Sequence, residues 1–259
     1  MKIGILQGRL SPQVNGQIQE FPVYSWEKEF DYVKKLNVNG IEWIITENFF
    51  LNNPFFSSVN FSDKILSVCA DNLVNDKIYD SFFLKSSVEP IIKKMLKLKL
   101  KTLVVPLLDK SSIQEKSVAE NFLKNFTKIA DNFPEIDFCF EFEASKDLIL
   151  DIVNARKNFF LTYDTGNFTS FFGKNVDHSS LIYFFNSKIK NVHLKDRTFD
   201  GVTKKFNTGD TNFIEIFKVL KEINYNNNYI LQFARDEEGE EFKYLKSTIK
   251  QIKKVYSQK

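Results

Sequence analysis

The feature that most constrains the fold is a regular alternation of short apolar runs with longer amphipathic segments. Eight runs rich in Val, Ile, Leu and Phe occur along the 259 residues, at 2–8, 40–45, 65–71, 102–108, 136–143, 159–164, 189–196 and 229–234. Most are nearly continuous in apolar residues, which is typical of parallel strands that are covered on both faces. We therefore expect a mainly parallel sheet.

Helical periodicity fills most of the connections. Apolar residues recur at spacings near 3.6 in segments 26–36, 88–98, 118–132, 146–154, 176–187, 213–223 and 240–255. The connection after the second run is different, because 48–62 is rich in Phe, Asn and Ser and indicates a loop or a broken helix. Eight strand–helix units favour one α/β domain, a (βα)8 TIM barrel over residues 1–259. A doubly wound open sheet is the alternative, but no G-x-G-x-x-G follows the first run to support it.

Composition limits the partners and the cellular compartment that we expect for the protein. The net charge is only +3, and the lysines are spread along helix-like segments, which indicates solvated helix faces and no nucleic-acid partner. Cys69 and Cys139 both lie inside apolar runs, so we expect buried free thiols in a reducing compartment. The chain opens directly into a strand-like run, and no apolar run approaches the roughly 18 residues of a membrane span. These features predict a cytoplasmic protein without a membrane partner.

Polar side chains stand near the ends of the last four apolar runs. They are Glu141, Asp164, His193 and Gln232. Burying such groups without partners is costly, and in a barrel the four would converge at one mouth. Two carboxylates, an imidazole and an amide oxygen suit one divalent ion such as Mn²⁺, Mg²⁺ or Co²⁺, and Zn²⁺ is also compatible. Each residue could instead make its own hydrogen bond at a strand end, but the set of four favours a metal.

Several stretches along nearly the whole chain carry a family resemblance. They are 4–12 (GILQGRLSP), 40–43 (GIEW), 67–71 (SVCAD), 140–143 (FEFE), 163–167 (YDTGN), 192–197 (VHLKDR), 209–210 (GD) and 230–235 (ILQFAR). In these the chain resembles the xylose-isomerase-like (βα)8-barrel superfamily of sugar and sugar-phosphate isomerases and epimerases. The resemblance implies one divalent metal held by Glu, Asp, His and Glu on four successive strand ends. Carried over, these are Glu141, Asp164 and His193, with Gln232 in the fourth place.

Gln232 departs from the family pattern in a way that bears on the reaction. The epimerases exchange a proton with two metal-linked glutamates on opposite faces of one carbon, whereas here only Glu141 could serve so, because an amide has no useful pKa. We expect a metal-dependent isomerase or epimerase that acts on a sugar or sugar phosphate through an enediolate. A keto-sugar or inositol dehydratase and a non-catalytic sugar-binding barrel are the alternatives.

Further residues are candidates for substrate binding. Lys195 lies two residues beyond His193 and could polarise a carbonyl or bind a phosphate, or could be an exposed lysine at the lip. Gln7 and Glu42 lie near the ends of the first two runs. Arg9, Arg197 and Arg235 follow the first, seventh and eighth runs and could bind a phosphate or carboxylate together. Alternatively, these arginines could form salt bridges in loops or at helix starts with Asp196, Asp210 or Asp236.

Three connections that a barrel would place beside its site are long, namely 9–25, 46–64 and 197–211, and 9–25 could fold over a ligand. An exposed apolar patch could be formed by four phenylalanines, Phe49, Phe50, Phe55 and Phe56. A second subunit could cover this patch, which would make the protein a homo-oligomer. His178 is expected to cap a helix or to face solvent. With two histidines, the chain cannot build the histidine-rich multi-zinc site of the DNA-repair endonucleases that share this fold.

Overall fold

The computed structural model describes residues 1–57, 62–75 and 77–258. The hydrogen-bonded order of the main strands is closed and runs β1-β10-β7-β6-β5-β4-β3-β2. The fold is therefore the (βα)8 barrel that the alternation predicts. The strands are β1 (Lys2–Leu6), β2 (Gly40–Ile44), β3 (Ile65–Cys69), β4 (Thr102–Leu107), β5 (Asp137–Phe142), β6 (Phe159–Asp164), β7 (Ile189–Leu194) and β10 (Asn228–Leu231). The chain forms two compact units, residues 1–40 with 163–259 and residues 41–162.

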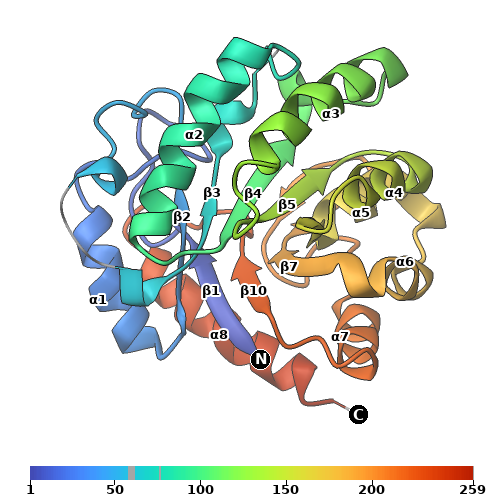
Figure 1. Cartoon of the computed structure of the whole chain (residues 1–259). Coiled ribbons are helices and arrows are strands. Elements are labelled where there is room, and N and C mark those ends of the chain that lie inside the picture. The colour runs from blue at the N-terminus through green and yellow to red at the C-terminus, as the bar shows by residue number, and fades with distance from the viewer. Residues whose placement is uncertain (58–61, 76, 259) are drawn as a thin grey trace. The chain divides into compact units, whose positions relative to one another are not determined.

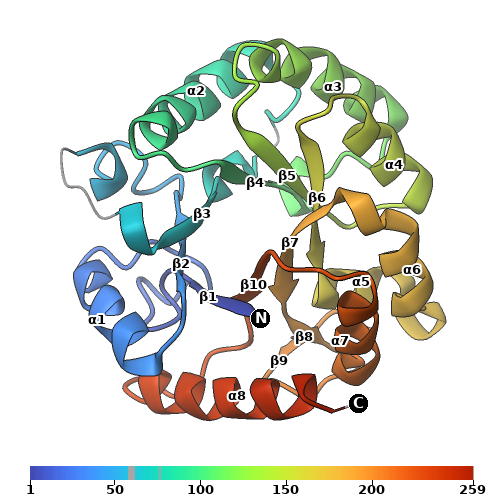
Figure 2. The same cartoon turned by 60° about the horizontal axis from the view of Figure 1, so that its bottom comes forward.

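The first unit contains β1, β10 and β7, which pair in parallel. Its helices are α1 (Trp26–Leu36), α5 (Thr165–Phe172), α6 (His178–Phe185), α7 (Phe213–Glu222) and α8 (Glu241–Tyr256). Helix α7 packs against both α6 and α8 (Figure 2). After β7, the short strands β8 (Asp196–Arg197) and β9 (Thr203–Lys204) pair antiparallel, so the connection predicted as a long loop contains a small hairpin.

The second unit contains strands β3, β4 and β5, and helices α2 (Ser81–Lys97), α3 (Lys116–Ala130) and α4 (Lys146–Asn154), with α2 beside α3 (Figure 1). Aromatic rings fill its core. Phe126 and Phe140 pack edge to face with ring centroids 5.3 Å apart, and Phe140 meets Phe159 at 4.9 Å. Phe138 packs on Phe126 at 5.2 Å. Such pairs add about 0.5–1.5 kcal/mol each beyond the area they bury, which accounts for part of the heavy use of Phe.

Most predicted elements are confirmed within a few residues, and α1 and α4 match their predicted bounds. Helix α5 was missed, because its sequence TGNFTSFF carries Gly, two Thr and three Phe and has poor helix propensity. The predicted segment 88–98 was too short, since α2 begins at Ser81 behind the N-cap Asp80. In the stretch 48–62, the described residues form only the 3₁₀ turn η1 (Pro54–Phe56) and the start of η2 (Ser62–Lys64), and 58–61 lie outside the described residues.

The expected apolar patch on the second unit is not present. Phe55 is fully buried and packs on Trp43 with centroids 5.9 Å apart, and Phe49, Phe50 and Phe56 are only half-buried. The turn that carries Phe55 is held by Asn53, whose side-chain oxygen accepts hydrogen bonds from the Trp43 indole and the Phe55 backbone. Both cysteines are buried and free, as predicted. No helix among the described residues has the length and apolar character needed to cross a membrane.

Candidate metal centre

Asp164 and His193 lie at the ends of β6 and β7 and are completely buried. Asp164 Oδ2 is 3.8 Å from His193 Nδ1. The other carboxylate oxygen, Oδ1, accepts a hydrogen bond of 2.8 Å from the backbone N–H of Asn167 and so caps α5. One side chain therefore serves two purposes, because Oδ1 fixes the helix while Oδ2 faces the imidazole.

Two cations converge beside this carboxylate. Lys195 Nζ lies 3.3 Å from Asp164 Oδ2 and donates to Asn167 Oδ1 at 3.2 Å. Arg197 Nη1 donates to the same Asn167 oxygen at 3.0 Å, and its Nε donates to the Gly201 carbonyl at 2.8 Å. A Cβ at Gly166 would lie only 2.9 Å from Lys195 Cγ, so the glycine of the DTGN sequence lets the helix start approach these side chains.

Asn167 was not singled out in the sequence analysis, although it stands in the quoted YDTGN stretch. It occupies the third position after an aspartate that ends a strand, which is the spacing of an N-cap and its partner. The structure shows that its side chain joins Lys195 to Arg197. This role depends on residues about 30 positions further along the chain, so local spacing did not indicate it.

Gln232 follows the last residue of β10. Its backbone N–H donates to the Leu194 carbonyl at 2.9 Å, which places it beside the end of β7. Its side-chain Nε2 donates to Gln19 Oε1 at 3.0 Å. Its Oε1 is buried and accepts no hydrogen bond from any residue that the structure describes. A buried amide oxygen of this kind is a suitable ligand for a hard divalent ion.

Arg9 and Arg235 both donate hydrogen bonds to backbone carbonyls of the loop 9–25. Arg9 Nη1 and Arg235 Nε each donate to the Ile18 carbonyl at 3.1 Å, and Arg235 Nη1 donates to the Ser11 carbonyl at 2.8 Å. These contacts show what the two guanidiniums do in this structure. Their predicted binding of a substrate anion remains a prediction. Gln7, just after β1, is buried.

A buried carboxylate anchors the start of the same loop. Glu29 of α1 accepts hydrogen bonds from the backbone N–H groups of Gly8 and Leu10 at 3.0 and 3.1 Å and from Ser11 Oγ at 2.9 Å. Gly8 adopts φ +90°, and a Cβ there would lie 2.9 Å from the Glu20 carbonyl. Burial raises the pKa of Glu29 to about 7, although the hydrogen bonds from Gly8, Ser11 and Leu10 oppose the shift.

Glu29 therefore predicts a pH dependence of stability. Between pH 4.5 and 7 the folded chain keeps a proton on Glu29 that the unfolded chain has lost, so rising pH lowers the free energy of unfolding by about 1.4 kcal/mol per pH unit. Glu29→Gln should remove this slope, and Glu27→Gln, at an exposed position of the same helix, should keep it. Urea unfolding at pH 5 and 7 measures both. Parallel pH profiles for Glu29→Gln and the wild type would contradict the assignment.

The two remaining candidates lie in the second unit. Glu141 is buried on β5 and pairs in register with Thr162 of β6, two residues before Asp164 on that strand. Glu42 is buried on β2 and accepts a hydrogen bond of 2.7 Å from Ser67 Oγ on β3. Glu42 is thus held by a neighbouring strand, and its contact with a substrate remains a prediction.

The expectation for His178 was wrong. His178 is the first residue of α6 but is buried, while Asp177 provides the N-cap. Its Nδ1 lies 2.7 Å from the Tyr163 hydroxyl and its Nε2 lies 3.1 Å from Thr169 Oγ1. Burial lowers the pKa of His178 to about 4, so the ring is neutral at pH 7. Both histidines are therefore buried, and neither is a surface residue.

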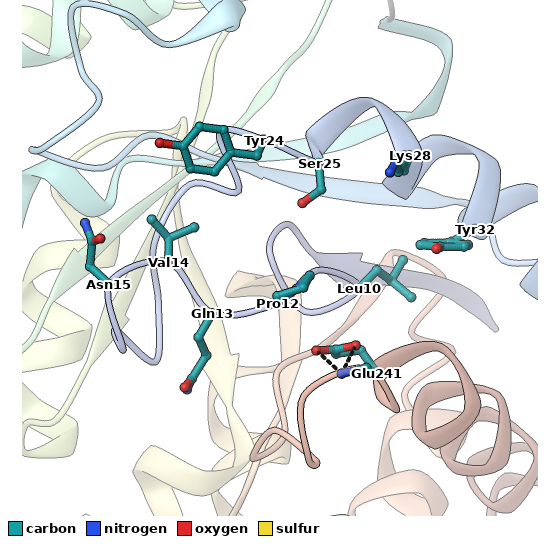
Figure 3. Close-up of a pocket in the computed structure, with 11 residues that line it drawn as sticks. Leu10, Pro12, Gln13, Val14, Asn15, Tyr24, Ser25, Lys28, Tyr32 and Glu241 are labelled. Atoms are coloured by element: carbon teal, nitrogen blue, oxygen red, sulfur yellow. Dashed lines mark hydrogen bonds between the residues drawn. The ribbon is translucent and has the colours of Figure 1, made fainter.

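A cavity of about 470 Å³ lies beside the loop 9–25 (Figure 3). Leu10 and Pro12 from the loop, Tyr32 of α1 and Glu241 at the start of α8 contribute to its lining. Glu241 is fixed there because both carboxylate oxygens accept from the Gly239 N–H, at 3.2 and 3.1 Å. None of the site residues predicted from sequence is among the residues that line this cavity.

The protein is a (βα)8 barrel, and the acidic and imidazole side chains at its strand ends form a candidate metal centre. Residues 89–254 match the model of the family described as xylose isomerase-like TIM barrel. The chain belongs to this family.

Solved structures of similar fold cover nearly the whole chain. A D-tagatose 3-epimerase-like protein is 18% identical with a TM-score of 0.66, over 99% of this chain and 98% of the other. An IolI protein with a bound zinc atom is 15% identical with a TM-score of 0.73, over 100% of both chains. The 3-keto-D-glucoside 4-epimerase YcjR from E. coli is 14% identical with a TM-score of 0.68, over 98% and 99%. No curated protein matches the chain at a significant level.

Proposed function

We propose that the protein is a metal-dependent isomerase or epimerase of a sugar or sugar phosphate. The observation that carries the proposal is the buried pair of Asp164 and His193, whose facing atoms lie 3.8 Å apart at the ends of two strands. The structural neighbours that are sugar epimerases, and the IolI protein that binds zinc, support the same chemistry.

The ligand set proposed for one divalent ion is Glu141, Asp164, His193 and Gln232. The first three are buried and each offers one ligand atom. The buried Gln232 Oε1 adds a neutral oxygen. Two carboxylates, an imidazole and an amide leave a net charge of about zero on a complex with a divalent ion, so a bound ion would retain strong Lewis acidity toward a substrate carbonyl. Mn²⁺, Mg²⁺, Co²⁺ and Zn²⁺ all fit such a set.

Different residues of the chain would have different roles in the proposed reaction. The Glu141 carboxylate would accept the proton from the carbon next to the substrate carbonyl and return it to the former carbonyl carbon. The hydroxyl proton on the first of these carbons would pass to the former carbonyl oxygen, which completes the conversion of an aldose to a ketose or the reverse. Lys195, held between Asp164 and Asn167, presents a positive charge that would steady a substrate oxygen or phosphate. Gln232 cannot exchange a proton, so a single base on one face favours a 1,2-shift over inversion at carbon.

Metal binding tests the first half of the proposal. A hundredfold excess of Mn²⁺ over its Kd should stabilise the chain by about 2.7 kcal/mol, which corresponds to a rise in Tm of roughly 5–10 °C that EDTA reverses. Thermal unfolding with Mn²⁺, Co²⁺, Mg²⁺ or Zn²⁺, together with metal analysis of the purified protein, gives the answer. Absence of both bound metal and any stabilisation would favour a barrel without a metal centre.

A screen of ketoses and their phosphates in D₂O tests the second half. Isomer formation with deuterium at the exchanged carbon supports the proposal. Loss of water with no isomer formed, seen as an enone-like absorbance, would indicate a dehydratase that uses the same residues.

A further inference from the structure

We infer that Gln19, on the loop 9–25, is a positioning residue that fixes the side-chain amide of Gln232. The inference rests on the proposed metal function, since it concerns the fourth place of that ligand set. Gln232 Nε2 donates to Gln19 Oε1 at 3.0 Å, across 213 residues of sequence. Gln19 is the acceptor in this bond and an amide donates only through its nitrogen, so the nitrogen end of the Gln232 side chain faces the loop.

The orientation matters because the two ends of an amide have opposite chemistry. With Nε2 directed at Gln19, the carbonyl oxygen of Gln232 points to other surroundings, where it is buried and accepts no hydrogen bond from the described residues. A rotated amide would present N–H groups in its place, and these cannot bind a cation. Gln19 therefore keeps the oxygen, and not the nitrogen, available for a cation or a sugar hydroxyl.

The residues before and after Gln19 are both held by hydrogen bonds. The carbonyl of the preceding residue, Ile18, accepts from the guanidiniums of Arg9 and Arg235, each at 3.1 Å. Glu20, which follows, is buried and accepts from the Phe21 N–H through its own side chain at 2.9 Å. The two arginines that follow β1 and β10 thus hold the backbone at the point where the loop meets Gln232.

The proximity of Gln232 to β7 places this pair next to the metal ligands of the first unit. The Gln232 N–H donates to the carbonyl of Leu194, the residue after His193. A bond that orients a ligand from outside the ligand set commonly changes metal affinity by 10–100-fold when removed. Gln19 would act in this way, through Gln232 and without touching the ion.

Substitution of Gln19 tests the pair without any metal. In NMR spectra of the full chain, the Gln232 side-chain NH₂ signals, identified by their loss in Gln232→Met, should be protected from solvent exchange in the wild type. Gln19→Met should abolish that protection, whereas Gln19→Glu should keep it, because a carboxylate oxygen still accepts the bond. Gln17→Met, at an exposed glutamine of the same loop, is the matched control and should change nothing. Unchanged protection in Gln19→Met would overturn the inference.

Mn²⁺ titration then tests the positioning role. Gln19→Met should weaken Mn²⁺ binding by about tenfold, and the same change made in the Gln232→Met background should have no further effect. A tenfold loss in both backgrounds, or in neither, would overturn the role of Gln19. A wild-type chain that binds no Mn²⁺ would instead contradict the proposed function, while the NH₂ signals would still decide on the Gln19–Gln232 pair.

Discussion

Replacing Glu141 with Gln is expected to abolish proton exchange between the substrate and solvent, with kcat lower by roughly 10²–10⁴-fold. The proposed reaction needs a base that takes a proton from carbon, and Gln232 in the fourth position cannot share that task because its amide does not titrate near neutral pH. Glu141 is buried on β5 beside Thr162, so its carboxylate belongs to the strand-end set and not to the surface. Deuterium incorporation from D₂O, measured on the sugar that the wild-type chain converts, gives the result.

Glu143 provides the matched control for that experiment. It lies two residues beyond Glu141, is only half-buried, and its backbone carbonyl accepts a hydrogen bond from Gln114 Nε2 at 2.8 Å that a side-chain change does not remove. Glu143→Gln should therefore retain activity. Deuterium exchange that persists in Glu141→Gln, or that is lost equally in Glu143→Gln, would refute the assignment of Glu141 as the base.

The barrel could be predicted from sequence because its strands are nearly continuous apolar runs, which is a local signal. Run 159–164 and β6 have the same bounds, and run 189–196 differs from β7 by only its last two residues. Helix α5 could not be predicted in this way, because its residues have poor helix propensity and its start depends on the cap from Asp164. The types and approximate places of the strand-end residues were equally local, since each stands at the end of its own run.

The contacts that support the site could not be predicted from sequence, because they join residues that are far apart along the chain. Glu29 lies among Glu, Lys and Asp residues in α1 and resembles an exposed helix face in sequence. Its burial depends on the chain turning back at Gly8 to present three donors. The Gln19–Gln232 bond joins residues 213 positions apart. No periodicity or spacing can indicate such pairs, because they depend on how the loop 9–25 is folded over the strand ends.

Replacing Asp164 with Asn separates the two purposes of that side chain and should weaken Mn²⁺ binding by about 100-fold or more. Asn caps a helix about as well as Asp, so Asn Oδ1 can still accept from the Asn167 N–H and α5 should remain folded. The change removes the negative charge from the atom that faces His193 at 3.8 Å and Lys195 at 3.3 Å, and with it the charge that would attract a cation there. Calorimetric titration with Mn²⁺ measures the loss, and the far-UV circular dichroism spectrum checks that the helix content is kept.

Asp177 allows the same substitution at a neighbouring helix cap that is outside the proposed ligand set. Its Oδ1 accepts from the Ser180 N–H at 2.9 Å at the start of α6, and the residue is exposed. Asp177→Asn should therefore leave Mn²⁺ affinity unchanged while altering a cap of the same kind. If Asp164→Asn and Asp177→Asn weaken Mn²⁺ binding equally, the loss comes from the cap or from overall charge, and Asp164 is not a ligand. If only Asp164→Asn weakens it, the effect belongs to the oxygen beside His193, since the cap bond is retained in both variants.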